Sequence, residues 1–262
     1  MCKKFISIIA LIVLATGCSN NNQSTDNVSK TQTVNVGVDN YVDLYMPVVN
    51  AYIALEQSGY TSYDESILGD DVCLTPNGGG SYFIGYDTKP ILMYTFYDLN
   101  GNGAPELLIG AELGVAEDVD RSNVFVTGIY GLRDGKPVSL IQVGAWSQLN
   151  VFTDNSDNCI IKKTSGTHID YVEEYFYKID KDETLITLDK LYTYSKIDDN
   201  NKPDDITYSH TKDVNGEEVS ITEQEYLALM QKYGFVGYFD TTGDLKANEI
   251  VIISWEPLTE YR

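Results

Sequence analysis

The stretch that decides the fold reads Ile91-Leu-Met-Tyr-Thr-Phe-Tyr97, then Asp98-Leu-Asn-Gly-Asn-Gly-Ala-Pro105, then Glu106-Leu-Leu-Ile-Gly-Ala111. The first and last parts are short apolar runs, and the middle part consists largely of residues that favour turns. Such a pattern predicts two strands joined by a loop, because strands are short and are bounded by Gly, Pro, Asn and Asp. We therefore expect strands at 91–97 and 106–111.

Similar short runs, separated by turn signals, continue toward the C-terminus. They are rich in β-branched and aromatic residues, and the twenty tyrosines of the chain suit such half-buried strands. The dipeptides Asp134-Gly135 and Asn215-Gly216 are typical of hairpin tips. We expect further strands near 124–132, 138–143, 149–152, 160–163, 171–179, 191–196 and 206–210.

Two helices are expected to flank these strands. Apolar residues recur at helical intervals before Ser58, so a helix should end there and begin near Asn40 or at Pro47, which could start or kink it. Ser220 and Thr222 each precede a glutamate by three positions, which predicts a capped helix that ends at Gly234. A last strand is expected at 250–255.

This order of elements predicts an α+β fold in a single domain, residues 39–262. Its main feature would be a large twisted antiparallel sheet, a meander, with one helix at the N-terminal end and another near the C-terminus. The alternative is a partial β-propeller, although no internal repeat is strong enough to predict a complete one.

The loop between the first two strands has the spacing of a calcium site. Oxygen-bearing side chains recur at alternate positions, and Gly103 permits the sharp turn that brings them together. The expected ligands of one structural Ca²⁺ are the side chains of Asp98, Asn100, Asn102 and Glu106, with the backbone carbonyl of Ala104. Because only two of these side chains are charged, we expect weak binding, with a Kd of about 10⁻⁴ to 10⁻³ M.

The loop resembles the D-x-[DN]-x-[DN]-G-x-x-[DE] loops that join strands in integrin-type and related bacterial surface repeats. It does not match an EF-hand, because Ile109 stands where the bidentate glutamate would be and the flanks are strand-like. The alternative is a plain hairpin, since Asn100-Gly101 and Asn102-Gly103 are strong turn formers by themselves. The other acidic runs, 180–183 and 198–205, lack this spacing and are expected to be solvated loops.

The N-terminal sequence predicts that the protein is exported from the cytoplasm. Lys3 and Lys4 precede an apolar segment too short to span a bilayer, and Leu14-Ala-Thr-Gly-Cys18 ends it. This resembles a bacterial lipoprotein signal peptide, which implies cleavage after residue 17 and anchoring to the membrane through a diacylglycerol on Cys18. An ordinary secretory signal or an uncleaved anchor is the alternative. Residues 18–38 are polar and are expected to form a flexible tether.

The net charge and the cysteine content limit which partners and which covalent links are expected. The formal net charge is −21, and loss of Lys3 and Lys4 with the signal makes it more negative, so nucleic acid is excluded as a partner. After processing, Cys73 and Cys159 remain, and they are expected either to form a disulfide or to stay as two separate thiols.

No catalytic motif stands out. His168 and His210 do not lie in a zinc-protease pattern or beside a recognisable nucleophile, and no nucleophile elbow or phosphate-binding loop is present. We therefore expect a binding or interaction module at the cell surface, with a carbohydrate or protein ligand and no catalysis. The alternative is a surface glycoside or peptide hydrolase that uses carboxylates brought together by the fold. Trp146, Trp255 and the tyrosines could supply an aromatic platform for either role.

Most of the region after the tether also resembles a group of uncharacterised surface lipoproteins from Gram-positive, often gut-dwelling, bacteria. The likeness rests on the loop at 97–110, on Ile129-Tyr-Gly-Leu132 before Asp134-Gly-Lys-Pro-Val138, and on Asn215-Gly-Glu-Glu-Val219. The resemblance implies the location and the fold but no particular chemistry.

Overall fold

The computed structural model describes residues 39–69, 72, 91–112, 124–143, 147–154, 158–168, 171–197, 203–211, 215–234 and 254–261. All of them belong to one compact unit, which spans Asn35–Arg262. The elements are, in chain order, α1 (Asp39–Gln57), α2 (Glu65–Leu68), β1 (Ile91–Tyr97), β2 (Glu106–Glu112), β3 (Val124–Arg133), β4 (Lys136–Gln142), β5 (Ser147–Thr153), β6 (Cys159–His168), β7 (Tyr171–Ile179), β8 (Leu185–Ile197), β9 (Pro203–Thr211), β10 (Val219–Ile221), α3 (Glu223–Lys232), β11 (Glu256–Pro257) and the short 3₁₀ helix η3 (Leu258–Glu260).

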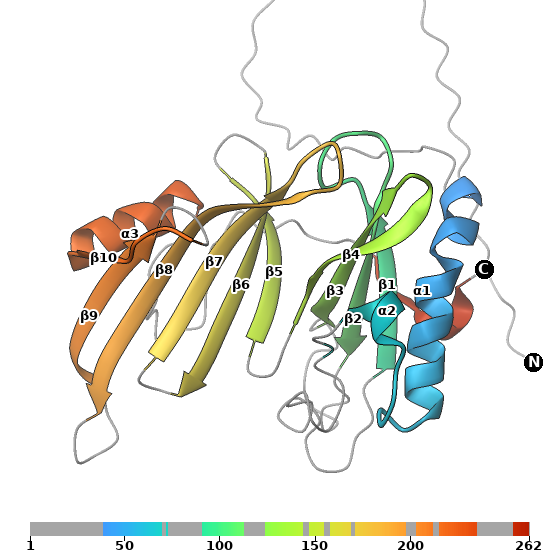
Figure 1. Ribbon diagram of the computed structural model, residues 1–262, viewed down its shortest axis with the longest axis horizontal. Helices are drawn as coiled ribbons and strands as arrows, with labels where there is room; N and C mark the ends of the chain where they lie inside the picture. Colours follow the sequence, from blue (N-terminus) through green and yellow to red (C-terminus); the bar gives the residue numbers. More distant parts are fainter. Residues whose placement is uncertain are drawn as a thin grey trace, which may run out of the picture. The chain divides into compact units, whose positions relative to one another are not determined.

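The strands that the structure describes form one sheet of eleven strands, and every pairing in it is antiparallel (Figure 1). Their order is β10-β9-β8-β7-β6-β5-β3-β2-β1-β11, with β4 paired to β3 beside this path. The sheet is open, since β10 and β11 form its two edges. The predicted α+β class, with a large antiparallel sheet and a helix toward each end of the chain, is confirmed. The alternative of a partial β-propeller is wrong.

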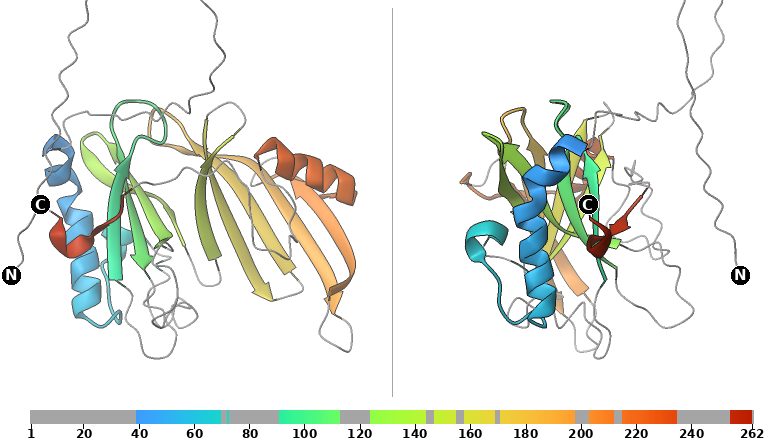
Figure 2. Two further views of the ribbon diagram at one scale, coloured as in Figure 1. Left: turned by 180° about the vertical axis from the view of Figure 1, so that it is seen from behind. Right: turned by 90° about the vertical axis from the view of Figure 1, so that its right-hand side faces the viewer.

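Strand β3 is the branch point of the sheet. From Gly128 to Arg133 it pairs with β4, whereas nearer its start Val126 pairs with Leu149 of β5. The strands therefore separate into a group around β1–β4 and a group from β5 to β10, as the left view of Figure 2 shows. The β3–β4 hairpin turns at Asp134-Gly135, and both residues have positive φ (53° and 71°), as a type I′ turn requires.

The first hydrophobic core lies between α1 and the group around β1–β4. Tyr45, Val48, Tyr52 and Leu55 recur at helical spacing on α1 and are fully buried, because this stripe of the helix packs on the apolar residues of the sheet. The Tyr52 and Tyr130 rings meet edge to face at a centroid distance of 6.1 Å, and the Tyr130 hydroxyl donates to that of Tyr52 at 3.0 Å. The predicted first helix is thus confirmed in place.

A second core lies under α3, on the other face of the sheet. Successive side chains of a strand point to opposite faces, so Val151 and Ile161 belong to the first core, while their neighbours Phe152 and Ile160 belong to the second. Tyr226 and Met230 of α3, with Tyr233 directly after the helix, complete this second core. The Tyr233 ring stacks on Phe176 at a centroid distance of 4.2 Å.

Several element boundaries differ from the prediction. Helix α1 begins at Asp39, so Pro47 lies inside it and does not start it. Thr222, and not Ser220, caps α3, because Ser220 pairs with β9 as part of β10. Strand β8 is longer than expected because it begins at Leu185, so that the polar residues Asp189 and Lys190, which precede the predicted strand, lie within it. Of the predicted last strand, residues 250–253 lie outside the described residues, and Trp255 precedes β11.

Polar contacts also attach α3 to the sheet. The buried carboxylate of Asp189 accepts hydrogen bonds from Lys232 (2.7 Å) and from the Tyr233 hydroxyl, and it pairs with His210 at 2.7 Å. Burial alone would raise the pKa of Asp189, but hydrogen bonds from Lys232, Tyr233 and His210 hold it below its usual value. The ionised carboxylate is therefore the form that the fold stabilises.

We expect Asp189→Asn to lower the free energy of unfolding by about 1.5–3 kcal/mol at pH 7, the range for a hydrogen-bonded charge. Because the pKa of Asp189 is lower in the folded state, this stabilisation is present above the unfolded pKa and is lost as the pH falls through the folded value. Urea denaturation between pH 7 and pH 3 should show the difference from the parent protein shrinking on acidification. Asp182→Asn, on an exposed residue near the same strand, is the control, and a difference independent of pH would contradict the assignment.

Candidate functional site

The β1–β2 loop curls around the side chain of Asp98. Its Oδ1 accepts a hydrogen bond from the backbone of Asn102 at 3.2 Å, and its Oδ2 accepts one from Gly103 at 3.0 Å. The Asn102 Oδ1 in turn accepts from the backbone of Ala104 at 2.7 Å. Gly103 has a φ of +89°, which agrees with the sharp turn expected at this position. The alternate positions of the loop therefore do turn toward one another, a geometry that both the calcium loop and the plain hairpin allow.

Glu106, at the start of β2, is fully buried. Its Oε2 accepts a hydrogen bond from the backbone of Leu99 at 2.6 Å, but its Oε1 has no hydrogen-bond partner among the described residues. Burial, together with the negative charges of Glu183 and Asp98, raises the pKa of Glu106 to about 8, despite the hydrogen bond from Leu99. A carboxyl group in this position takes up a proton unless a positive charge is supplied.

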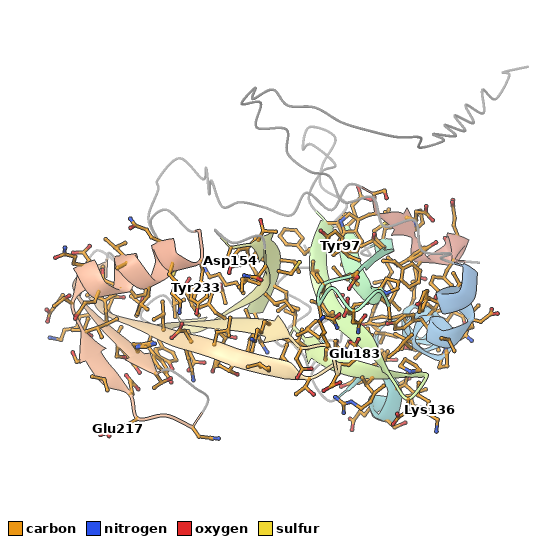
Figure 3. All side chains as sticks on the ribbon, turned by 90° about the horizontal axis from the view of Figure 1, so that it is seen from above. Tyr97, Lys136, Asp154, Glu183, Glu217 and Tyr233 are labelled. Atoms are coloured by element: carbon orange, nitrogen blue, oxygen red, sulfur yellow. The ribbon has the colours of Figure 1, made fainter. Side chains whose placement is uncertain are left out.

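Glu183 joins this loop from the turn between β7 and β8. Its Oε1 accepts hydrogen bonds from the side-chain amides of Asn100 at 3.1 Å and Asn102 at 2.8 Å. Its Oε2 has no hydrogen-bond partner among the described residues, and only 4% of the residue is exposed. The interpretation of 180–183 as a solvated loop is therefore wrong for Glu183, although Lys181 and Asp182 are exposed. Figure 3 labels Glu183, near the strands of the group around β1–β4.

Backbone geometry holds Glu183 in this position. The residue has a φ of +58°, and its backbone carbonyl accepts a hydrogen bond from Arg133 at 2.7 Å. Its carboxylate lies against Gly131 of β3, where an added Cβ would stand only 2.1 Å from Oε2. No local pattern in the sequence signals this contact, since Gly131 and Glu183 lie on separate hairpins. Strands β5 and β6 lie between β3 and β7 in the sheet, so this contact arises from the tertiary fold and not from pairing of neighbouring strands.

The predicted calcium ligands are thus neighbours, with Glu183 as an unexpected addition. Across the described ranges, no three His, Cys, Asp or Glu side chains are gathered closely enough to form a metal site as they stand. Asn100 and Asn102 present their amide nitrogens to Glu183, while their oxygens accept backbone hydrogen bonds. Calcium binding by this loop remains a prediction.

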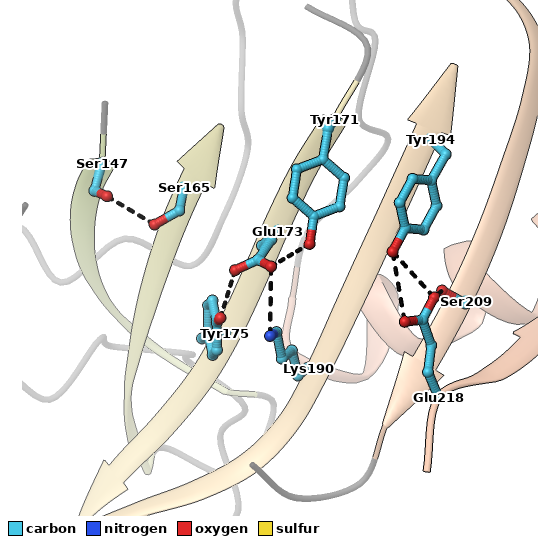
Figure 4. Close-up of polar contacts among 9 residues, drawn as sticks. All are labelled: Ser147, Ser165, Tyr171, Glu173, Tyr175, Lys190, Tyr194, Ser209 and Glu218. Carbon is cyan, nitrogen blue, oxygen red and sulfur yellow. Dashed lines mark hydrogen bonds and ion pairs between the residues drawn. The ribbon is translucent and has the colours of Figure 1, made fainter. Parts of the chain in front are cut away.

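A second candidate site lies on the face of β7–β9 opposite α3 (Figure 4). The strand register places Tyr171 opposite Tyr194 and Tyr175 opposite Lys190, and the alternation of side chains puts them on one face. We call this surface the tyrosine face, and it comprises Tyr171, Glu173, Tyr175, Lys190, Tyr192, Tyr194 and Ser209.

Charged groups of the tyrosine face are held between its rings. The Glu173 carboxylate accepts hydrogen bonds from the hydroxyls of Tyr171 and Tyr175 and pairs with Lys190 at 3.5 Å. Burial alone would raise the pKa of Glu173, but these contacts lower it. The Lys190 ammonium lies over the Tyr175 ring at 4.4 Å and over the Tyr192 ring at 4.5 Å, two cation–π contacts.

An open pocket of about 420 Å³ adjoins this face. Tyr194 has 38% of its surface exposed, and its ring lies 4.9 Å from that of Tyr171, centroid to centroid. The Tyr194 hydroxyl donates to Glu218 at 3.2 Å, and Glu218 also accepts from Ser209. The pocket is lined by Tyr171, Tyr194, Ser195, Lys196, Asp205 and Thr207. Aromatic rings beside several hydrogen-bonding groups are typical of ligand sites.

Several predicted residues lie outside the described residues, namely Cys18, Cys73 and Trp146. Cys159 is half-buried, and burial, together with the charge of Glu106, raises the pKa of its thiol to about 12. Because Cys73 lies outside the described residues, the disulfide between Cys73 and Cys159 stays a prediction. His210 is held by Asp189, and the side chain of His168 is among the parts not described.

Comparison with known proteins adds no relative: no protein family, no curated protein and no solved structure matches the chain. Within the described residues, no helix is long and apolar enough to cross a membrane.

The contact between Glu183 and Gly131 can be tested by a double-mutant cycle. Gly131→Ala places a Cβ in the space of the Glu183 carboxylate, so we expect it to lower the free energy of unfolding by about 1–3 kcal/mol, the range for overpacking. In a Glu183→Ala background the same substitution should cost clearly less, because the overlapping atoms are gone. Equal costs in the two backgrounds, measured by urea denaturation, would show that the carboxylate does not lie against Gly131.

Proposed function

We propose that this protein is a lipid-anchored, extracytoplasmic binding module whose tyrosine face and adjoining pocket take a neutral carbohydrate. The observation that supports this most is the pocket beside Tyr171 and Tyr194, where partly exposed rings stand next to hydroxyl, carboxylate and ammonium groups. A sugar presents apolar C–H faces and many hydroxyls, and a surface of this mixed character can contact both.

Charge also favours a neutral ligand. The chain carries a formal net charge of −21, which repels polyanions such as nucleic acids or acidic polymers. A cationic ligand would find Lys190 already occupying the space between two rings of the tyrosine face. A neutral polyhydroxy ligand meets neither obstacle.

Binding is preferred over hydrolysis because of the state of the carboxylates. A glycosidase needs one carboxylic acid whose pKa is raised, so that it can protonate the leaving group. On the tyrosine face the pKa of Glu173 is lowered. The carboxyl group with the raised pKa, Glu106, is fully buried instead, away from any ligand in the pocket. The hydrolase alternative therefore has weaker support than the binding module.

Two further elements of the proposal come from the sequence. The anchor is a diacylglycerol on Cys18, followed by the polar tether of residues 18–38. The second element is a structural Ca²⁺ bound by the β1–β2 loop through Asp98, Asn100, Asn102, Ala104 and Glu106. Its support is the curled loop, together with a buried glutamate whose Oε1 has no hydrogen-bond partner among the described residues.

We expect Tyr194→Ala to weaken carbohydrate binding about tenfold or more, a loss of about 1.4 kcal/mol that matches one aromatic contact. Affinity electrophoresis in gels that contain a soluble glucan, mannan or xylan measures this as a loss of retardation. Leu44→Ala is the matched control, since Leu44 on α1 has 37% of its surface exposed against 38% for Tyr194.

Retardation of the parent protein by none of the three polysaccharides would contradict the carbohydrate proposal. Retardation that Tyr194→Ala and Leu44→Ala reduce equally would remove the tyrosine face as the binding surface. Release of reducing sugar from a retarding polysaccharide would favour the hydrolase instead.

The anchor predicts that Cys18→Ala abolishes incorporation of labelled fatty acid and moves the protein from the membrane fraction to the soluble fraction. The reason is that two acyl chains hold a protein stably at a membrane, whereas the polar tether has no comparable apolar surface. Metabolic labelling followed by fractionation measures both effects, with Cys159→Ala as the control. An unlabelled parent protein, or equal labelling of Cys18→Ala, would reject the anchor.

A further inference from the structure

We propose that Glu183 is an additional ligand of the calcium site, so that the cation is held between the β1–β2 loop and the turn that joins β7 to β8. This inference rests on the proposed calcium site and extends it to a second segment of the chain. The ligand set then contains three carboxylates, those of Asp98, Glu106 and Glu183, in place of two.

The first support is a pair of buried carboxylate oxygens with no hydrogen-bond partner among the described residues. They are Oε1 of Glu106, in a residue with 0% exposure, and Oε2 of Glu183, in a residue with 4% exposure. Leaving a buried charged oxygen without a partner is costly, and buried charges in proteins are paired or bind metal ions. A cation held by both groups would satisfy the two oxygens together.

The second support is that the loop and the turn already touch through the predicted ligands. Asn100 and Asn102 both direct their side-chain amides at Oε1 of Glu183, at 3.1 and 2.8 Å. Asn100 also donates to the backbone carbonyl of Asp180 at 3.0 Å, and Asn102 to that of Lys181 at 3.3 Å. Each of these amide groups carries an oxygen as well as two N–H donors, so rotation of the amide could offer that oxygen to a cation.

The third support is that no described residue pairs a positive charge with these carboxylates. Within the described parts of the chain, no ion pair involves Asp98, Glu106 or Glu183. The nearby Arg133 donates to the backbone carbonyl of Glu183 and not to its carboxylate. Carboxylate, amide and carbonyl oxygens are the ligands that Ca²⁺ prefers, whereas Zn²⁺ sites usually include His or Cys.

The space for Glu183 is provided by Gly131. Any side chain at that position would meet the carboxylate, at 2.1 Å from an added Cβ to Oε2. Because glycine has no side chain, the Glu183 carboxylate can lie directly against β3 at this position.

The test is isothermal titration of CaCl₂ into the full chain, purified in detergent and depleted of metal with a chelator. We expect one site in the parent protein, and Glu183→Gln should weaken it at least tenfold, because charge count sets the affinity of such sites. Asp182→Asn removes a neighbouring exposed carboxylate and should leave the affinity unchanged. Glu183→Asp, which keeps the charge but shortens the side chain, is the second variant and should also bind more weakly.

Thermal melts of the same variants separate ligand loss from unfolding. Glu183→Gln keeps the shape and the acceptor oxygen, so in chelator it should melt at or above the temperature of the parent protein. In millimolar Ca²⁺ it should gain less than the parent, with Mg²⁺ as the control for screening.

The failures of the two proposals are distinguishable. Calcium binding that Asp98→Asn abolishes, but that both Glu183 variants retain at full affinity, overturns the role of Glu183 and leaves the site in the β1–β2 loop. A parent protein that takes up no Ca²⁺ overturns the calcium site itself and the role of Glu183 with it.

Discussion

The fold depends on how one sheet buries both of its faces. At β5 and β6 the alternation of side chains sends Val151 and Ile161 to the core under α1, and Phe152 and Ile160 to the core under α3. A single helix is too narrow to cover a sheet of eleven strands, so each helix covers a different part of it. Because α3 covers one face of β7–β9, the residues of the opposite face can be polar and aromatic. The tyrosine face is this opposite face of β7–β9, which α3 does not cover.

Local patterns predicted most of the strands, and the misses have physical causes. The strands at 91–97 and 171–179 are confirmed at both ends, since turn formers or polar residues bound them. The start of β8 was missed because Asp189 and Lys190 do not look like strand residues until their partners are known. Asp189 is buried only because Lys232, Tyr233 and His210 surround it, and these residues come from the C-terminal end of α3 and from β9. Ser220 has the spacing of a helix cap, but pairing with Ser209 places it in β10.

The candidate sites, too, could be predicted from the sequence only where their residues are close together in the chain. The curl of the β1–β2 loop follows from residues close in sequence, so the spacing of Asp98 and Gly103 was sufficient to predict it. Glu183 reaches that loop from a turn that several strands of the sheet separate from it, a tertiary contact that no short motif encodes. The tyrosine face likewise requires the register between β7 and β8, because Tyr171 and Tyr194 become neighbours only when the hairpin closes. Local chemistry can be predicted from spacing, whereas convergence of distant residues depends on register.

One hairpin connects the two candidate sites. Strands β7 and β8 meet at the turn that carries Glu183, and the Tyr171–Tyr194 pair lies toward the other end of the same hairpin. Ile179, where β7 ends before the turn, lies eight positions after Tyr171, and at about 3.4 Å per residue the two ends of β7 are roughly 27 Å apart. A cation at the turn therefore cannot touch a ligand in the pocket. It would act on the pocket only by holding the end of the hairpin closed, which makes its contribution one of stability and not of recognition.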